Sequence, residues 1–255
     1  MLSAGSIQQD GVWTTEAFWM AFVMQSTRKA AGATGQKPFR RRPPGRTRLQ
    51  QAQKDNTRQE LLKAANRLFT ESSYAATTVD DIVSNAGVSR TTFYRHFSSR
   101  LAIAEALFRE AMVPAQAIHE RLAAYENPND RQIADWANAI IDHLVANRSL
   151  VRTMREVEAI EPTSDSATED THRQLIKLYG RKIRAFRMAA SNAPAQAEIR
   201  IRAQLLMLQF DQFFYAVAVR ESIDRKVGVR VMVREFRRFV EDVAARSRSQ
   251  ARLAS

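Results

Sequence analysis

The chain of 255 residues contains no cysteine, only four histidines, and few glycines or prolines. The lack of cysteine excludes disulfide bonds, thiolate zinc sites and cysteine nucleophiles, and it is typical of proteins in a reducing compartment. The histidines stand far apart, so no pair has the i, i+4 spacing that places two metal ligands on one helix face. They are His96, His119, His143 and His172. We therefore expect no metal site and no cofactor.

Long hydrophobic runs are also missing near the start of the chain. The longest uninterrupted apolar stretch there, Ala17–Met24, has eight residues, whereas a membrane span needs about 20. A secretory signal carries positive charge before its apolar stretch, but here Asp10 and Glu16 come first and the basic residues follow. We expect a cytoplasmic protein with no membrane partner.

The formal charge of +12 points to an anionic partner. Residues 1–54 carry nine Lys or Arg and two acidic residues, residues 55–112 carry seven of each, and residues 113–255 carry 23 and 18. The first segment also holds five of the eight glycines and three of the seven prolines, a composition that does not support a packed core. We predict a disordered basic N-terminal extension there. Its cluster Lys37–Arg48 is either an arm that binds DNA phosphates or the minor groove, or a solvated tail, and the tail interpretation is favoured for residues 1–36.

From Thr57 onward the pattern is helical, with only three further glycines and no sustained strand alternation. The expected fold class is therefore all-α. Thr57 and Glu60 have the spacing of a capping box, which predicts a first helix from Thr57 to about Ser72.

Two short helices joined by a tight turn are predicted between Thr78 and Phe97. Thr78 and Asp81 have the spacing of an N-terminal cap. Gly87 supplies the left-handed residue that the turn needs, and Ser89 caps the second helix. This is the helix-turn-helix layout, in which the second helix enters the major groove of DNA.

Polar and basic side chains on or beside this second helix are the candidate DNA contacts. Arg90 and Thr92 suit base edges. Thr78, Tyr94 and His96 suit phosphates, and a packed, hydrogen-bonded histidine is the alternative for His96. The full candidate set is Thr78, Ser89, Arg90, Thr91, Thr92, Tyr94, Arg95, His96 and Arg100.

The segment Thr57–Met112 resembles the N-terminal domain of the TetR family of regulators. The resemblance is carried by Ala65, Leu68, Phe69, Thr77–Val79, Ile82, Ala86–Ser89, Phe93–Phe97, Arg100 and Leu101. It implies a homodimer with a three-helix DNA-binding domain, an effector-binding body, and two C-terminal helices that pair in a four-helix bundle. The chain has Ser73 where the family usually has glycine, and Arg100 where it usually has lysine. With Arg100, the expected phosphate contact is made by a forked guanidinium and not by the single ammonium of lysine.

The predicted organisation has a helix-turn-helix DNA-binding domain, a larger helical effector-binding and dimerisation domain, and a short C-terminal tail. Their expected bounds are 55–112, 113–246 and 247–255. Helices of the larger domain are expected at about 130–147, 148–160, 168–190, 195–220 and 225–246.

By the resemblance, an effector pocket lies among the first four of these helices. Its expected lining is Trp136, Ile140, His143, Leu144, Met154, Val157, Leu178, Phe186, Met207, Phe210, Asp211 and Phe214. This set favours a small lipophilic effector over a highly charged one. Such stripes are also the usual pattern of a plain hydrophobic core. Asp211 stands in a very apolar helix, so its carboxylate needs either a partner or an exposed edge.

The two C-terminal helices are predicted to form the dimer interface. The segment 195–220 is apolar on more faces than one core covers. The segment 225–246 carries a continuous apolar stripe of Val229, Met232, Val233, Phe236, Val240 and Val243.

The sequence thus predicts a TetR-type, sequence-specific transcriptional regulator. We expect a repressor that binds a double-stranded DNA operator as a homodimer, with its DNA affinity gated by a small lipophilic effector. The alternative is an effector-independent dimeric DNA-binding protein whose C-terminal body only dimerises. An enzyme is not expected, because Ser, His and Asp occur in no nucleophile elbow, glycine loop or metal signature.

Overall fold

The structure is a computed structural model that describes residues 48–161 and 166–253. Within these ranges the chain is helical and contains no strand, which confirms the all-α expectation. The helices are α2 (Arg48–Ser72), α3 (Val79–Ala86), α4 (Arg90–His96), α5 (Arg100–Ala123), α6 (Asp130–Ala146), α7 (Arg148–Ile160), α8 (Ser166–Tyr179), α9 (Arg184–Ala189), the short 3₁₀ helix η1 (Pro194–Gln196), α10 (Ala197–Ala218) and α11 (Arg225–Leu253). Almost all of the predicted basic extension, including residues 37–47 of its cluster, lies outside the described residues.

Helix α2 begins at Arg48, earlier than the capping-box spacing predicted. Thr57 lies inside the helix, where its hydroxyl donates to the carbonyl oxygen of Gln53 at 2.9 Å. The preceding residues are mostly Gln, Lys, Arg and Ala, which are good helix formers, so the helix extends through the expected cap. The predicted boundary at residue 54 therefore falls within α2, and the boundary at residue 112 falls within α5.

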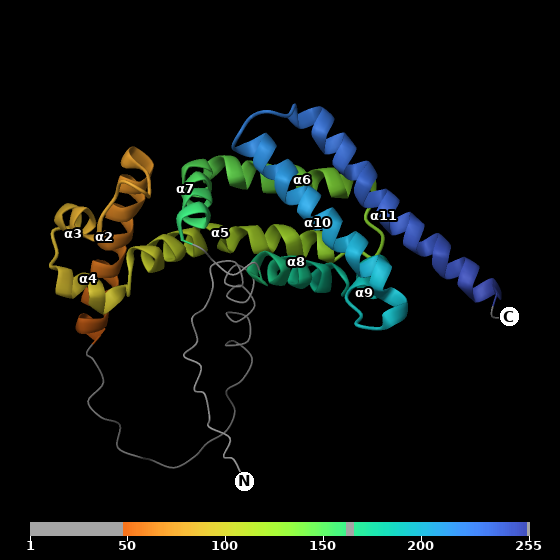
Figure 1. Cartoon of the computed structure of the whole chain (residues 1–255), viewed down its shortest axis with the longest axis horizontal. Helices are drawn as coiled ribbons and strands as arrows, with labels where there is room; N and C mark the ends of the chain where they lie inside the picture. Colours follow the sequence, from red (N-terminus) through yellow and green to blue (C-terminus); the bar gives the residue numbers. More distant parts are fainter. Residues whose placement is uncertain (1–47, 162–165, 254–255) are drawn as a thin grey trace, which may run out of the picture.

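Helices α2 to α4 and the first half of α5 gather at one end of the molecule (Figure 1). They pack around a common core that includes Leu61, Ile82 and Phe93, each with no exposed surface. Burying an aliphatic or aromatic side chain of this size contributes about 1.5–3 kcal/mol. Residues of α7, among them Val157, belong to the same core, so the larger body packs directly against this head.

The helix-turn-helix forms as its capping residues predicted. Thr78 and Asp81 make a reciprocal capping box at the start of α3, and Gly87 ends it with a φ of 65°. The hydroxyl oxygen of Ser89 accepts from the backbone N–H of Thr92 at 3.1 Å and so caps α4.

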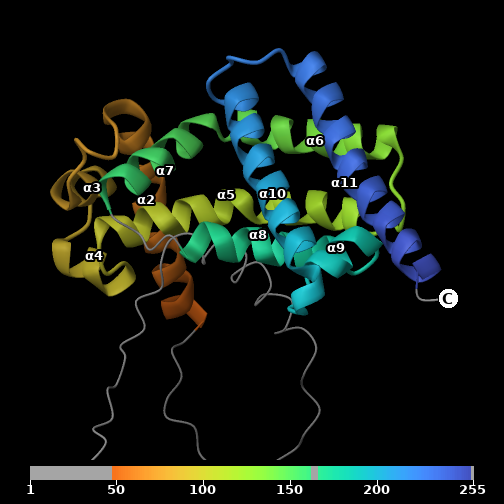
Figure 2. The ribbon, with the colours of Figure 1, turned by 45° about the vertical axis from the view of Figure 1, so that its right-hand side comes forward.

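Helix α5 runs from the head into the body, where it packs against α6, α7 and α8 (Figure 2). It continues through Pro114, which is exposed. The predicted helix over 168–190 is instead two helices, α8 and α9, with a break at Gly180. A Cβ atom at Gly180 would lie 3.0 Å from the backbone of Arg187, so this position needs glycine for α9 to fold back so closely.

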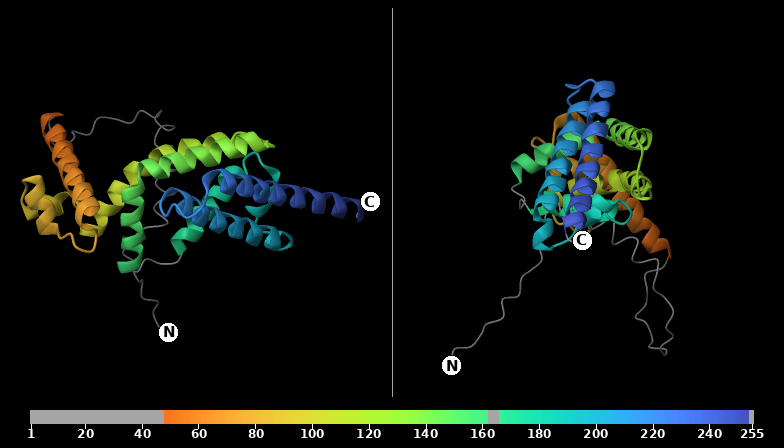
Figure 3. Two further views of the ribbon diagram at one scale, coloured as in Figure 1. Left: turned by 90° about the horizontal axis from the view of Figure 1, so that it is seen from above. Right: turned by 90° about the vertical axis from the view of Figure 1, so that its right-hand side faces the viewer.

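The C-terminal helices α10 and α11 lie side by side (Figures 1 and 3). Gly228 faces the Phe213 ring so closely that a Cβ atom would collide with it. The apolar stripe predicted to face a partner lies instead in the chain's own core, where Phe236 is 1% exposed. The prediction was wrong about the face because α11 must first cover the aromatic core formed by α6, α9 and α10. The apolar side chains left exposed on these two helices are Ile201, Leu205, Leu208, Val227 and Val231.

A search of the described residues finds no helix that is both long and apolar enough to cross a membrane.

Candidate DNA-binding surface and internal cavity

The exposed face of α4 carries the residues predicted to contact DNA. The Arg90 side chain is 59% exposed, and its guanidinium forms a 3.0 Å ion pair with Asp80 of α3. A hydrogen bond with Tyr94 and the nearby charge of Asp80 raise the pKa of Arg90. Tyr94 is 49% exposed although it is a large aromatic residue. An exposed arginine beside an exposed phenol is chemically suited to base edges and phosphates.

The other candidates divide between exposed side chains and caps. Thr91 and Arg95 are exposed on α4. Thr92 is half-buried, and its hydroxyl lies 3.0 Å from that of Ser89. Thr78 is exposed, with its hydroxyl donating to Asp81 at 2.7 Å. The DNA contacts of all these residues remain predictions.

His96 is half-buried at the end of α4. Partial burial, followed by the positive charges of Arg95, Lys54 and Arg58, lowers its pKa. The imidazole is therefore neutral at neutral pH, and it would contact a phosphate through a ring N–H and not as a cation.

Arg100 faces the interior of the head and not the exposed side of α4. Its guanidinium donates to the carbonyl oxygens of Tyr74 and Thr77 at 3.1 and 2.7 Å. It also lies 4.0 Å from the centre of the Tyr74 ring. These contacts give Arg100 a role in holding the segment between α2 and α3, while the predicted phosphate contact stays a prediction.

Tyr74 joins the DNA-binding head to α7. Its backbone N–H donates to Glu156 at 2.8 Å, and its hydroxyl donates to Glu161 at 3.0 Å. Arg100 lies 3.8 Å from the same Glu161 carboxylate. We call this group of four residues the α7 junction. The pKa of Tyr74 is raised, mainly by burial, so its hydroxyl keeps its proton.

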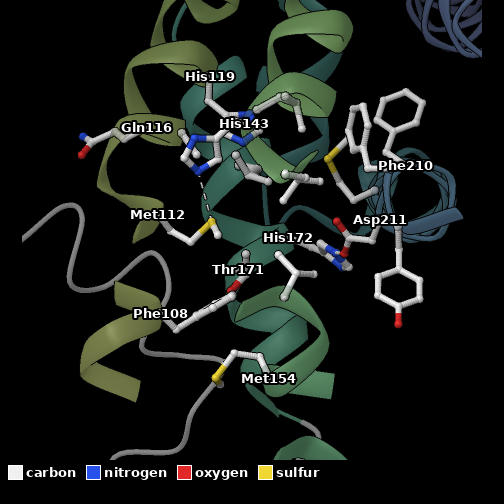
Figure 4. A pocket seen from close by; sticks show the side chains of 18 of the residues that line it. Phe108, Met112, Gln116, His119, His143, Met154, Thr171, His172, Phe210 and Asp211 are labelled. Atoms are coloured by element: carbon white, nitrogen blue, oxygen red, sulfur yellow. Dashed lines mark hydrogen bonds and ion pairs between the residues drawn. The ribbon is translucent and has the colours of Figure 1, made fainter. Parts of the chain in front are cut away.

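A cavity of about 250 Å³ lies in the body among α5, α6, α7, α8 and α10 (Figure 4). The predicted lining residues that border it are Trp136, Ile140, His143, Leu144, Met154, Leu178, Met207, Phe210, Asp211 and Phe214. Two predicted members do not line it. Val157 is fully buried in the core of the head, and Phe186 packs against Phe236 and Phe239.

Sequence reasoning missed several polar lining residues. They are Gln116, His119, Glu158, Thr171, His172 and Tyr179. The sequence does not indicate which polar side chains of α5 and α8 face the cavity, because this depends on how these helices pack against α10. Only the apolar periodicity of each helix was visible in sequence.

His119 lies in a buried aromatic cluster. Its Nδ1 accepts from the indole N–H of Trp136 at 3.3 Å and lies 2.7 Å from the hydroxyl of Tyr179. Because an indole N–H only donates, Nδ1 carries no proton and the neutral ring is protonated at Nε2. Burial lowers the pKa of His119 to about 4. His119 therefore stays neutral at physiological pH.

Asp211 of α10 receives its partner from α8. Its carboxylate pairs with Nε2 of His172, which is 3% exposed (Figure 4). The sequence left a partner and an exposed edge as alternatives, and Asp211 has both, since its side chain is 46% exposed. The described residues hold no group of three or more His, Cys, Asp or Glu side chains suited to a metal ion.

The capped helix pair and the exposed face of α4 define a helix-turn-helix DNA-binding protein. A family model for bacterial regulatory proteins of the tetR family matches residues 61–107, which span α2 to α5. Over residues 61–107 the chain thus carries the DNA-binding domain that this family model describes.

Two curated relatives match this chain over part of their length. The chain is 31% identical over 88 residues to the HTH-type transcriptional repressor BepR of Brucella suis, covering 34% of this chain and 42% of that protein. It is 37% identical over 71 residues to the HTH-type transcriptional activator FasR of Mycolicibacterium smegmatis, covering 28% and 32%. The aligned region thus spans less than half the length of either relative.

Solved structures share the fold over more of the chain. A TetR-family regulator of Streptomyces coelicolor matches with a TM-score of 0.53 and 18% identity, covering 78% of this chain and 86% of that one. A putative TetR-family regulator of Syntrophomonas wolfei matches with a TM-score of 0.52 and 18% identity, covering 73% and 95%. At this identity the likeness shows the fold alone.

Proposed function

We propose that the chain binds a double-stranded DNA operator as a homodimer and represses transcription until a small lipophilic effector enters the cavity. The observation that carries this proposal is that α7 does two things at once. Its residues Met154 and Arg155 line the cavity, and its residue Glu156 and the following Glu161 bind Tyr74 of the head. A ligand that moves α7 would therefore move the DNA-binding head.

The exposed face of α4 supports DNA recognition. Arg90, Tyr94 and Arg95 are exposed there, and the Asp80 ion pair is an exposed contact that a nucleic-acid partner can replace. Thr78 and Ser89 cap the starts of α3 and α4, and backbone N–H groups at helix starts favour phosphates. Any DNA contact of Arg100 would require it to leave the α7 junction.

Dimerisation is supported by the outer face of α10 and α11. Leu205 is 54% exposed, Ile201 55% and Val231 45%, and these apolar side chains have no cover within the chain. A contiguous exposed apolar face marks a contact with another molecule. A second copy is the partner we propose, because a two-fold dimer places two α4 helices on successive major grooves about 34–36 Å apart.

Repression is the proposed sign of regulation because blocking a promoter requires only occupancy of the operator. Release by an effector requires that the ligand bind one arrangement of head and body better than the other. We expect the protein to act in the cytoplasm, where bacterial DNA lies.

The alternative is an effector-independent DNA-binding dimer. The cavity favours effector gating, because an empty space lined by Met112, Met154 and Met207 would be filled by larger side chains in a body that only dimerises. Mapping the bound genomic sites would identify the operator. Titrating the dimer onto that DNA with metabolites of the neighbouring genes would then test release, and operator affinity that no such compound changes would favour the alternative.

A further inference from the structure

The cavity has an excess of negative charge. Among the described residues that line it, Arg155 is the only Lys or Arg, whereas Glu158 and Asp211 are both carboxylates. Arg155 is already engaged, because it forms a 3.0 Å ion pair with Glu158 and lies 4.9 Å from the centre of the Tyr215 ring. The lining therefore offers no spare arginine or lysine for an anionic ligand.

Two of the cavity histidines do not supply positive charge. Burial lowers the pKa of His119 to about 4 and also lowers the pKa of His143. Both rings are neutral at neutral pH. His172 binds the Asp211 carboxylate as a hydrogen-bond partner. The Asp211 side chain still keeps 46% of its surface exposed, so it is available to a ligand.

Aromatic rings line the same cavity as the Asp211 carboxylate. Trp136 contacts Phe210 and Phe214 edge-to-face, with ring centres 5.8 and 5.6 Å apart. Both phenylalanines lie on α10 within one turn of Asp211, and all four residues line the cavity. Aromatic faces attract cations, most strongly where water is excluded. Aromatic faces and a carboxylate in the lining of one cavity are groups suited to bind an organic cation.

We propose that the effector is a lipophilic organic cation whose positive nitrogen lies between Asp211 and the rings of Trp136, Phe210 and Phe214. The apolar remainder of the ligand extends toward Phe108 and Met154, at the other end of the labelled lining (Figure 4). An anion is disfavoured by the Asp211 carboxylate, and a neutral ligand makes no use of its charge. This assignment rests on the proposal that the cavity is the effector site.

Three probes of similar size test the charge requirement in the full-length protein by isothermal titration calorimetry. Benzyltrimethylammonium is the cation, neopentylbenzene is its neutral carbon isostere, and 4-phenylbutyrate is an anion. We expect the cation to bind at least tenfold more tightly than either of the others. Asp211→Asn, which keeps the shape and an acceptor for His172, should remove that preference. Asp135→Asn changes an exposed carboxylate of α6 that does not line the cavity and should leave the preference intact.

Tighter binding of the anion or the neutral isostere would overturn the assignment. A cation preference that Asp211→Asn leaves unchanged would also overturn it. The same holds if no probe binds at millimolar concentration. Measuring operator affinity in the presence of each probe distinguishes failure of this assignment from failure of the proposed function. If the cation binds through Asp211 but leaves operator affinity unchanged, the ligand class stands and effector gating fails. If the anion releases the DNA and the cation does not, gating stands and the ligand class fails.

Discussion

Two residues of the head, Ser73 and Gly87, adopt left-handed backbone conformations with φ of 77° and 65°. A residue with a side chain costs about 1 kcal/mol more than glycine in this region. A Cβ atom at Gly87 would meet nothing within 4 Å, so strain alone sets the cost of adding one. The left-handed Ser73 occupies the position where the family pattern has glycine, which explains why that pattern favours glycine there.

We predict opposite effects of two substitutions at these positions. Gly87→Ala should lower the free energy of unfolding by about 1 kcal/mol. Ser73→Gly should raise it by a smaller amount, because glycine also gains entropy in the unfolded chain. Urea unfolding monitored by circular dichroism measures both. A stabilising Gly87→Ala would contradict the assigned conformation.

The buried His119 makes stability depend on pH. Its folded-state pKa of about 4 lies below the ordinary value of 6.5. Between these values the unfolded chain binds a proton that the folded chain does not, so stability falls as pH falls from 6.5 to 4, by about 1 kcal/mol per pH unit. We predict that His119→Gln flattens the dependence of the melting temperature on pH in this window. A variant that loses stability as steeply as the wild type would rule out this role.

At the scale of elements, α7 connects the cavity to the head through the α7 junction. Tyr74 is fully buried, and its backbone N–H donates to the carboxylate of Glu156. We predict that Glu156→Ala lowers the free energy of unfolding by about 1–3 kcal/mol, the cost of leaving a buried donor unpaired. Glu71→Ala, an exposed change on α2, serves as the control and should stay within about 0.5 kcal/mol of wild type. Equal stabilities of the two variants would show that the α7 junction does not stabilise the fold.

Element boundaries were predictable where a cap was local. Thr78, Asp81 and Gly87 fixed α3 because capping and turn formation involve neighbouring residues. The spacing of Thr57 and Glu60 failed because a strong helix-forming segment precedes it. The apolar face of each body helix was visible in its periodicity, whereas the pairing of His172 with Asp211 depends on the packing of α8 against α10. No local pattern encodes that contact.

At the scale of the whole molecule, α11 has one face buried in the chain's own core, and α10 and α11 share an exposed outer face. We predict that Leu205→Glu combined with Val231→Glu yields a folded monomer, because both side chains are exposed within the chain. Phe236→Asp should instead unfold the body, since Phe236 is buried among aromatic rings. Sedimentation velocity and circular dichroism distinguish these outcomes. An intact dimer in the double variant would place the interface elsewhere.

The central claim is that the exposed face of α4 reads operator DNA. The most direct test is a fluorescence anisotropy titration of operator DNA with wild type, Arg90→Ala and Arg131→Ala, the last removing an arginine of α6 that is 91% exposed. Loss of one good base contact costs about 1–3 kcal/mol. The account predicts that Arg90→Ala weakens operator binding about tenfold or more while Arg131→Ala leaves it unchanged. Equal affinity of Arg90→Ala and wild type would contradict it.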